Sequence, residues 1–156
     1  MSSQPKRKTI AQLRAEKEQR DKDFIYGVDL ATEMLAARSR IKEGLVEDAE
    51  VHYEEVKALL VQANRALDHL KHHTDNQFYR ATFQTKADLH GSIGEYNMAI
   101  TLLRQTDELY LAAERNGSID KLGHDLWASA LASLGFHCLE SHQLEAAKRC
   151  FLRISN

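Results

Sequence analysis

Apolar residues recur at intervals of three and four along most of the chain, which is the spacing of one face of an α-helix. The first run predicts a helix that begins at Ile10, because Thr9 and Gln12 fit a capping box that closes an amino-terminal turn. Residues 13–23 are nearly all polar or charged, so we expect this helix to be solvated until Phe24. Its buried face is then expected to comprise Phe24, Val28, Ala31 and Leu35.

Two further runs predict a second and a third helix. The second helix starts near Glu47, after Gly44 interrupts the pattern, and extends for about seven turns. Its apolar stripe comprises Ala49, Tyr53, Val56, Leu60, Ala63, Leu67 and Leu70. Turn and capping residues at 74–76 precede the third helix, which is expected to end near Gly91 or Gly94. That helix opens with Phe78, Ala81, Phe83 and Ala87.

The remainder of the chain predicts three more helices. The fourth carries on one side Ala99, Leu103, Thr106, Tyr110 and Ala113. It stops at residues 116–118, where Gly117 can take a left-handed conformation and Ser118 can cap the next helix. The fifth helix is expected from Ile119 to Glu140, and the sixth from Leu144 to Ile154.

The composition favours an all-α fold. The 156 residues include seven glycines and one proline, too few turn residues for a fold of many short strands. The length suits one domain, which we place at residues 24–156, after a basic, charged arm at residues 1–23. No stretch approaches the roughly 20 apolar residues of a membrane span, so no membrane insertion is expected. Two cysteines without paired spacing favour a reducing, intracellular and cytoplasmic location.

The three helix pairs, at about residues 24–73, 75–115 and 118–154, share a repeated set of positions. Each first helix has a small residue, and a turn residue follows seven positions later. An alanine then enters the second helix five positions after the turn, and a large apolar residue follows four positions further on. Small residues let two helices approach closely, while the large residue fills the space beside them. The sets are Ala37, Gly44, Ala49 and Tyr53; Ala87, Gly94, Ala99 and Leu103; and Gly135, His142, Ala147 and Phe151.

These positions resemble the tetratricopeptide repeat. The third unit is nearest to that family's pattern, which it matches at Leu131, Leu134, Gly135, Cys138, Ala147 and Phe151. The second unit is similar to the family's commonest turn over residues 94–100, whereas the first departs at Glu33 and Arg40. Successive units are 50 and 48 residues apart, rather than the usual roughly 34. Members of that family with longer helices, such as kinesin light chains and G-protein-modulating adaptors, are similar in that their repeats are longer too.

The resemblance implies three antiparallel helix pairs stacked as a right-handed α-solenoid, whose first helices line a concave surface that holds part of another protein. Projection from the matched positions gives this surface as Met34, Arg38, Ile41, Gln84, Asp88, Ala132, Phe136 and Leu139. Phe136 and Leu139 are either additional core or an exposed contact, and core is favoured. Relatives that bind chaperone tails carry Asn where this chain has Arg38, Asp88 and Phe136, so that activity is not expected.

Histidines are the main candidates for chemistry. His69 and His73 have a spacing that can hold a metal ion, but they lie at a helix end, where protonated imidazoles interact favourably with the terminal carbonyls. Cys138 and His142 share the spacing but occupy packing and turn positions. No nucleophile elbow, HExxH motif or phosphate-binding loop occurs. We therefore expect no metal, no cofactor and no enzymatic activity.

Charge is unevenly distributed along the chain. The formal net charge is −2, yet residues 1–22 hold seven Lys and Arg against three Asp and Glu. Lys6, Arg7 and Lys8 could form a nuclear import signal, a phosphate-binding arm or a clamp for an acidic surface, or could merely solubilise the chain. Nucleic acid is disfavoured as a partner, since the body is acidic and lacks aromatic residues interleaved with Lys and Arg.

Together these features predict a non-catalytic adaptor or scaffold, a small structural subunit that contacts several other proteins within one assembly. The basic arm and the charged first helix would lie on a partner. A cytoskeletal or ciliary complex is a setting suggested by analogy with other small repeat proteins. Two alternatives remain open: a nucleic-acid or acidic-surface binder acting through the arm, and a peptide-sensing regulatory repeat protein.

Overall fold

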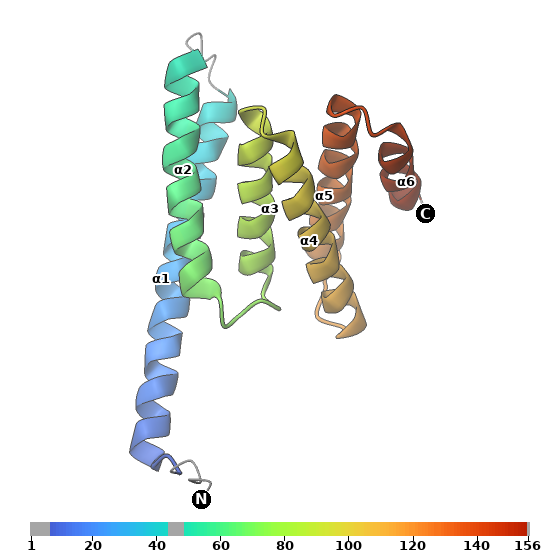
Figure 1. Cartoon of the computed structure of the whole chain (residues 1–156). Coiled ribbons are helices and arrows are strands. Elements are labelled where there is room, and N and C mark those ends of the chain that lie inside the picture. The colour runs from blue at the N-terminus through green and yellow to red at the C-terminus, as the bar shows by residue number, and fades with distance from the viewer. Residues whose placement is uncertain (1–6, 44–48, 156) are drawn as a thin grey trace, which may run out of the picture.

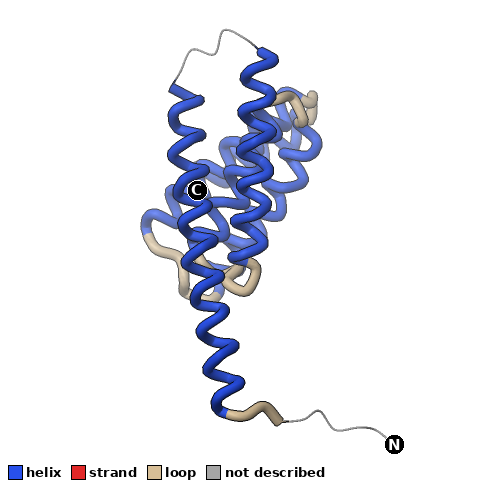
Figure 2. The backbone as a smooth tube through the Cα atoms, turned by 90° about the vertical axis from the view of Figure 1, so that its left-hand side faces the viewer, coloured by secondary structure: helices blue, strands red, loops and turns tan. Residues whose placement is uncertain are grey.

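The computed structural model describes residues 7–43 and 49–155, and these residues form six helices with no strand. The helices are α1 (Ile10–Glu43), α2 (Ala49–Leu70), α3 (Gln77–Ser92), α4 (Tyr96–Arg115), α5 (Lys121–Glu140) and α6 (Leu144–Ser155). The all-α prediction is therefore confirmed (Figure 2). None of these six helices combines the length and the apolar character that crossing a bilayer requires.

Each helix packs against the next one in the chain, so the molecule is a row of neighbouring helix pairs (Figure 1). The first helices of the pairs also contact one another, α1 with α3 and α3 with α5. In the part of the chain that the structure describes, the second helices α4 and α6 are joined by the ion pair of Asp107 with Arg153 at 2.7 Å, but their backbones do not approach one another as those of the first helices do. The first helices therefore lie closer together and form one shared face.

Two large clusters and one small cluster of buried side chains hold the row together, and the small one, Leu30, Ala31 and Ala66, lies between α1 and α2. The first joins α1 and α2 to the end of α3 and comprises Met34, Val56, Leu59, Leu60, Ala63 and Leu89. The second extends through the other four helices and comprises Ala87, Ile100, Leu102, Leu103, Tyr110, Ala130, Leu134, Cys138, Ala147 and Cys150. Because successive helices share these clusters, the orientation of each helix depends on its neighbours.

Local capping fixes where several helices begin. The amide of Thr9 donates to Gln12 Oε1 at 2.9 Å, and the amide of Gln12 donates to Thr9 Oγ1 at 3.1 Å. This reciprocal pair is the predicted capping box, and α1 begins at Ile10 as expected. The side chain of Asn76 likewise accepts from a backbone amide in the first turn of α3.

The start of α5 differs from the prediction. Asp120 is its amino-terminal cap and accepts from the amide of Gly123 at 2.8 Å. Ser118, expected to fill that role, instead donates its hydroxyl to the carbonyl of Ala113 in the last turn of α4. The prediction was wrong because a serine between two helices can serve either end, and the carboxylate two residues later is the better acceptor.

Three helices end in the same hydrogen-bonded turn, a Schellman motif in which an amide bonds back across six residues. The amide of Glu95 donates to the carbonyl of His90 at 3.0 Å. In the same way the amide of Ser118 donates to the carbonyl of Ala113 at 2.9 Å, and that of Gln143 to the carbonyl of Cys138 at 2.7 Å. The left-handed residues within these turns are Gly94 (φ 82°), Gly117 (φ 68°) and His142 (φ 61°). Gly94 and His142, matched by the repeat, therefore occupy the same place in the same turn.

Most repeat positions of the second and third units are buried. They are Ala87, Ala99, Leu103, Leu134, Gly135 and Ala147. The ring of the half-buried Phe151 lies on Gly135, where an added Cβ would be only 2.7 Å from the ring's Cζ. A small residue at position 135 is thus what lets α6 approach α5 closely.

The first unit departs from the expected packing. Ala37 is half-buried beside the first core cluster. Tyr53 is 44% exposed, with Lys57 Nζ 5.2 Å from its ring centroid, so its predicted packing role is wrong. Its stripe neighbour Val56, one turn further along α2, faces the core instead. Gly44 and the side chain of Ala49 lie outside the described residues.

The buried face of α1 is also rotated from the predicted one. Gly27, Leu30, Ala31 and Met34 are the buried residues, whereas the predicted Phe24, Val28 and Leu35 are half-buried. Only Ala31 belongs to both sets. The rotation arises because the leucine at the end of α2 lies directly against the glycine of α1, which brings the Gly27 side of the helix to the interface.

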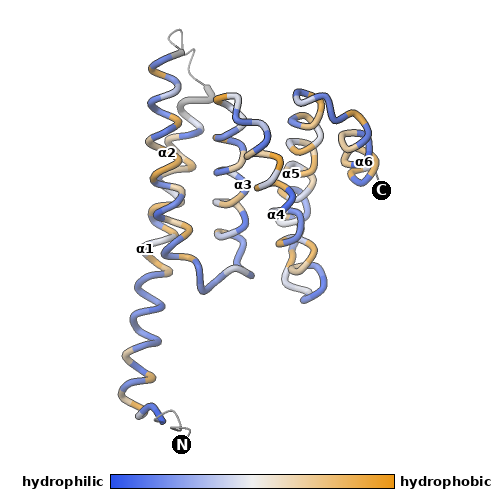
Figure 3. The backbone as a smooth tube through the Cα atoms, in the orientation of Figure 1, coloured by the Kyte–Doolittle hydropathy of each residue, from blue (hydrophilic) through white to orange (hydrophobic). Residues whose placement is uncertain are grey.

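The amino-terminal part of α1 extends beyond the end of α2 (Figures 1 and 3). Near that end, His69 Nδ1 lies 3.7 Å from Asp23 Oδ1, and the rings of His73 and Phe24 are 4.6 Å apart. Residues 10–22, which we call the amino-terminal extension, are exposed apart from one half-buried glutamate. At 1.5 Å per residue this extension is about 20 Å long.

Candidate functional site

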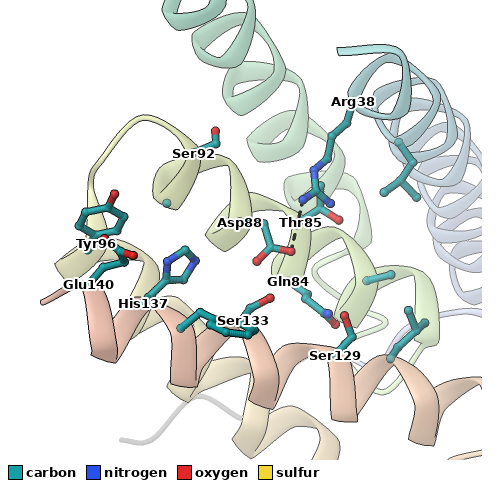
Figure 4. A pocket seen from close by; sticks show the side chains of 15 residues that line it. Arg38, Gln84, Thr85, Asp88, Ser92, Tyr96, Ser129, Ser133, His137 and Glu140 are labelled. Carbon is teal, nitrogen blue, oxygen red and sulfur yellow. Dashed lines mark ion pairs between the residues drawn. The ribbon is translucent and has the colours of Figure 1, made fainter. Parts of the chain in front are cut away.

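An open groove of about 760 Å³ lies on the face shared by the first helices (Figure 4). Its lining residues come from α1, α3, the start of α4 and α5, so three helix pairs contribute to it. The α1 and α3 lining is Leu35, Arg38, Ala81, Gln84, Thr85, Asp88, Gly91 and Ser92. The remaining lining is Tyr96, Leu126, Ser129, Ser133, Phe136, His137 and Glu140.

Helical periodicity accounts for the polar stripe along the α5 wall. Ser129, Ser133 and His137 are spaced four residues apart, and Glu140 follows after three, so all four project from one side of the helix. The α5 residues of the second core cluster, Ala130, Leu134 and Cys138, each follow a stripe residue by one position and lie on the adjoining side of the helix. The groove is therefore the polar side of helices whose apolar sides form the core.

An ion pair links two walls of the groove. Arg38 Nη2 of α1 lies 3.5 Å from Asp88 Oδ2 of α3 (Figure 4). The two side chains are 30% and 16% exposed, so the pair is less accessible to solvent than an ordinary surface ion pair. Its position means that a molecule in the groove meets both charges together.

His137 occupies the middle of the α5 wall. Its ring lies on Gly91, where an added Cβ would meet the ring, and its centroid is 5.8 Å from that of Tyr96. Burial lowers the pKa of His137, and the nearby carboxylates of Asp88 and Glu140 partly offset that effect. The imidazole is therefore held mainly in its neutral form, able to donate one hydrogen bond and accept one.

A buried chain of polar groups supports the groove from behind. Tyr110 Oη donates to Gln84 Oε1 at 3.1 Å and accepts from Gln77 Nε2 at 3.2 Å. Arg80 donates to Gln77 Oε1 at 3.1 Å and to the carbonyl of Asp75 at 2.6 Å. Burial lowers the pKa of the Arg80 guanidinium, partly offset by the neighbouring tyrosine and aspartates. These contacts fix Gln84, which is only 5% exposed, at the base of the groove.

Phe136 is the large apolar side chain at the edge of the groove. It is 59% exposed, and its ring meets that of Phe151 edge-on with centroids 5.3 Å apart. The expectation that Phe136 and Leu139 would add to the core is wrong, since Leu139 is also 40% exposed. Phe136 lines the groove and Leu139 lies beside α6, on parts of the α5 surface that the second core cluster does not include.

The other predicted lining residues divide into two groups. Arg38, Gln84 and Asp88 line the groove together with Phe136. Met34 was wrongly placed on this surface, because it is completely buried between α1 and α2. Ala132 and Leu139 lie outside the groove lining, and the side chain of Ile41 lies outside the described residues.

Sequence reasoning missed the hydroxyl and imidazole groups of the groove. These are Thr85, Ser129, Ser133 and His137. For α5 their signal was present as the four-residue spacing of the polar side chains at positions 129, 133 and 137. On the fifth helix the predicted surface comprised only the apolar residues Ala132, Phe136 and Leu139, so its polar side chains were missed.

The basic arm is only partly within the described residues. Lys6 lies outside them, and Arg7 and Lys8 are exposed. Lys8 Nζ lies 2.8 Å from Glu16 Oε1, so this charge pairs with the amino-terminal extension of its own chain. An exposed pair of this kind contributes little stability.

Residues considered for metal binding are spread over separate contacts. In residues 7–43 and 49–155, no three His, Cys, Asp or Glu side chains gather as they would around a metal ion. His69 contacts Asp23 and Tyr26, while His73 packs on Phe24. Both cysteines are buried and unoxidised, and burial raises the pKa of each thiol, which makes them poor nucleophiles.

Comparisons with protein-family models, with curated proteins and with solved structures return no match. The function must therefore be argued from the groove itself. Its chemistry is that of a mixed surface: one exposed aromatic ring, one ion pair between helices, and hydroxyl, amide and imidazole groups along two walls.

Proposed function

We propose that this protein is a non-catalytic intracellular adaptor that binds a segment of another protein in the groove formed by α1, α3 and α5. The observation that carries the proposal is the combination of an exposed aromatic residue with hydrogen-bonding groups in one open groove. Phe136 offers a large apolar contact, while Gln84, Ser129 and Ser133 offer hydrogen-bonding groups beside it. Recognition sites commonly pair an aromatic anchor with a few oriented polar groups.

An extended segment suits this groove better than a helix. A peptide in extended conformation leaves its backbone amides and carbonyls unpaired, and side-chain hydroxyls and amides along the groove can satisfy them. The α5 wall provides such groups at every turn, at positions 129, 133 and 137. A helix satisfies its own backbone and would leave these groups without partners.

The proposal includes a repeat architecture of tetratricopeptide type, stacked as a right-handed solenoid. Two observations support it: the matched turns at Gly94 and His142, and the mutual contacts of α1, α3 and α5. Helices that approach one another across successive units lie on the inner side of a curved array, which is where such arrays bind their partners. The exposed amino-terminal extension would offer a second contact within a larger assembly.

A comparison of two substitutions on α5 tests the proposal. Phe136→Glu places a charge in the groove, and Leu122→Glu places the same charge at a residue with the same 59% exposure outside it. Each tagged variant is expressed in the cells from which the gene comes, and co-purifying proteins are quantified by mass spectrometry. We expect Phe136→Glu to lose at least one partner by about tenfold or more, and Leu122→Glu to retain it.

Circular dichroism provides the check on folding. Because both side chains are largely exposed, both variants should keep the helical signal and melt within a few degrees of the wild type. Equal recovery of every co-purifying protein with the two variants would contradict binding through the groove. Turnover of a substrate by the purified protein, lost on His137→Gln, would contradict the non-catalytic assignment.

A further inference from the structure

The α5/α6 pair carries a shallow apolar groove at the end of the row, which we call the end face. Its volume is about 430 Å³, and its lining is Leu139, Leu144, Ala147, Lys148, Phe151, Leu152 and Ser155. Leu144 is 64% exposed and Leu152 is 54% exposed. α6 packs on α5, and its Arg153 pairs with Asp107 of α4 at 2.7 Å. Among the described residues, those that line this face all belong to α5 and α6 or the turn between them, so no third helix covers it. Apolar side chains gathered on a surface in this way mark interaction sites.

The repeat relates the end face to a surface inside the molecule. Gly94 and His142 hold the same place in the same turn, which sets the second and third units in register 48 residues apart. With this offset, residues of α3 and α4 correspond to residues of the end face. The pairs are Gly91 and Leu139, Tyr96 and Leu144, Ala99 and Ala147, Ile100 and Lys148, Leu103 and Phe151, Arg104 and Leu152, and Asp107 and Ser155. Arg104 is exposed, so the apolar Leu152 is particular to the end face.

In the second unit these positions receive α5. His137 of α5 lies on Gly91, and its ring centroid is 5.8 Å from that of Tyr96. Trp127 of α5 donates its indole N–H to Asp107 Oδ1 at 2.8 Å. The corresponding core residues, Ile100 and Leu103, share a buried cluster with α5 side chains. The surface that corresponds to the end face is thus an established helix-binding surface within the same fold.

We propose that the end face binds an amphipathic helix of another protein, which lies against α5 and α6 as α5 lies against α3 and α4. The bound helix would present an apolar stripe to Leu144, Phe151 and Leu152. It would carry an acidic residue opposite Lys148, which stands where the internal interface has the buried Ile100. This proposal is independent of the groove on the α1, α3 and α5 face, because Leu144 and Leu152 do not line that groove.

A second copy of the chain fits this face less well than a partner helix. Two end faces packed about a twofold axis would bring both copies of Lys148 into one small apolar contact. Unpaired like charges in an apolar contact are unfavourable. A helix from a different protein can instead place a carboxylate opposite the lysine, so charge favours that occupant.

A defined peptide tests the proposal directly. The probe is a fluorescein-labelled peptide with the sequence of residues 120–141, with Cys138→Ser, because α5 is the helix that the corresponding internal surface accepts. Its binding to the full chain is measured by fluorescence anisotropy. We expect saturable binding that weakens about tenfold or more in the double variant Leu144→Glu/Leu152→Glu. The control is Val61→Glu/Leu122→Glu, whose residues are 62% and 59% exposed elsewhere, and it should bind like wild type.

Light scattering and thermal melting complete the test. We expect the wild type and both double variants to be monomeric and to melt within a few degrees of one another. Absence of peptide binding, or equal weakening in both double variants, would overturn the proposal. A wild-type dimer that Leu144→Glu/Leu152→Glu abolishes would assign the face to a second copy instead. A much lower melting temperature for that variant would show that the leucines belong to the chain's own core and would also overturn it.

Discussion

His142 holds a backbone conformation that disfavours its own side chain. Its φ of 61° lies in the left-handed region, whereas the equivalent turn of the second unit has Gly94. A residue with a Cβ costs roughly 1–2 kcal/mol in this region, and glycine recovers only part of that because it is more flexible when unfolded. We expect His142→Gly to stabilise the protein by about 0.5–1 kcal/mol, measured by urea unfolding.

The reciprocal substitution provides the control. Gly94→Ala should destabilise the protein by about 1 kcal/mol through φ alone, because an added Cβ there meets nothing within 4 Å. Loss of stability in His142→Gly would mean that the imidazole makes a contact worth more than the relief of the backbone. In that case the two turns would not be equivalent at the residue level.

Single residues also show where a sequence pattern is ambiguous. Ser118 and Asp120 are both good caps, and only the distances to Ala113 and Gly123 decide which helix end each one serves. Tyr53 fits the apolar stripe of α2 by spacing, yet it is exposed. Spacing gives the side of an isolated helix on which a residue lies. It does not say how far along that side the neighbouring helix reaches.

At the scale of elements, α1 consists of two parts with different roles. The part that packs on α2 is fixed by contacts at Phe24 and Tyr26 with His73 and Arg65. The amino-terminal extension, residues 10–22, is almost wholly exposed. A helical segment without tertiary packing contributes little to global stability. We expect the free energy of unfolding of a chain that starts at Asp23 to lie within about 1 kcal/mol of that of the full chain, as measured by urea titration.

A longer truncation gives the comparison. A chain that starts at Asp29 also loses the ring contact of Phe24 with His73 and the packing of Gly27 on Leu70. Its free energy of unfolding should be lower than that of the full chain by about 2 kcal/mol or more, with a matching fall in melting temperature. If both truncations destabilise the protein equally, the extension packs on the body in solution.

At the scale of the whole molecule, the free energy of unfolding depends on pH through His137, whose ring lies between the α3 and α5 walls of the groove. Burial holds its pKa below the value of about 6.5 that it has when unfolded. The unfolded state therefore takes up a proton at higher pH than the folded state does, so acidification favours unfolding. The stabilising contribution is fully present above about pH 6.5 and is lost as the pH falls through the folded-state pKa.

A variant that cannot titrate isolates this effect. Between about pH 7.5 and about pH 5.5, the wild type should lose more stability than His137→Gln, which lacks the ionisable group. Urea unfolding of both proteins across this range provides the measurement. Parallel pH profiles would mean that the carboxylates of Asp88 and Glu140, which favour the protonated ring, fully offset its burial, and would contradict the expected shift.

The sequence by itself determined the six helices, most of their ends and the matched turns. These features depend on interactions within a few residues: the spacing of apolar side chains, the capping box at Thr9, and the glycine of a helix-ending turn. The repeat offsets identified Gly94 and His142 for the same reason, since each turn closes through hydrogen bonds among its own residues.

Only the tertiary structure decided which side chains face solvent. Met34 and Arg38 lie one turn apart on α1, yet the first is completely buried and the second lines the groove. Phe136 is a large apolar residue of the kind that usually lies in a core, yet it is exposed. The charged Arg80, by contrast, is only 2% exposed. The rotation of each helix and the reach of its neighbour set these outcomes. Both depend on contacts between residues far apart in the chain, which no local pattern encodes.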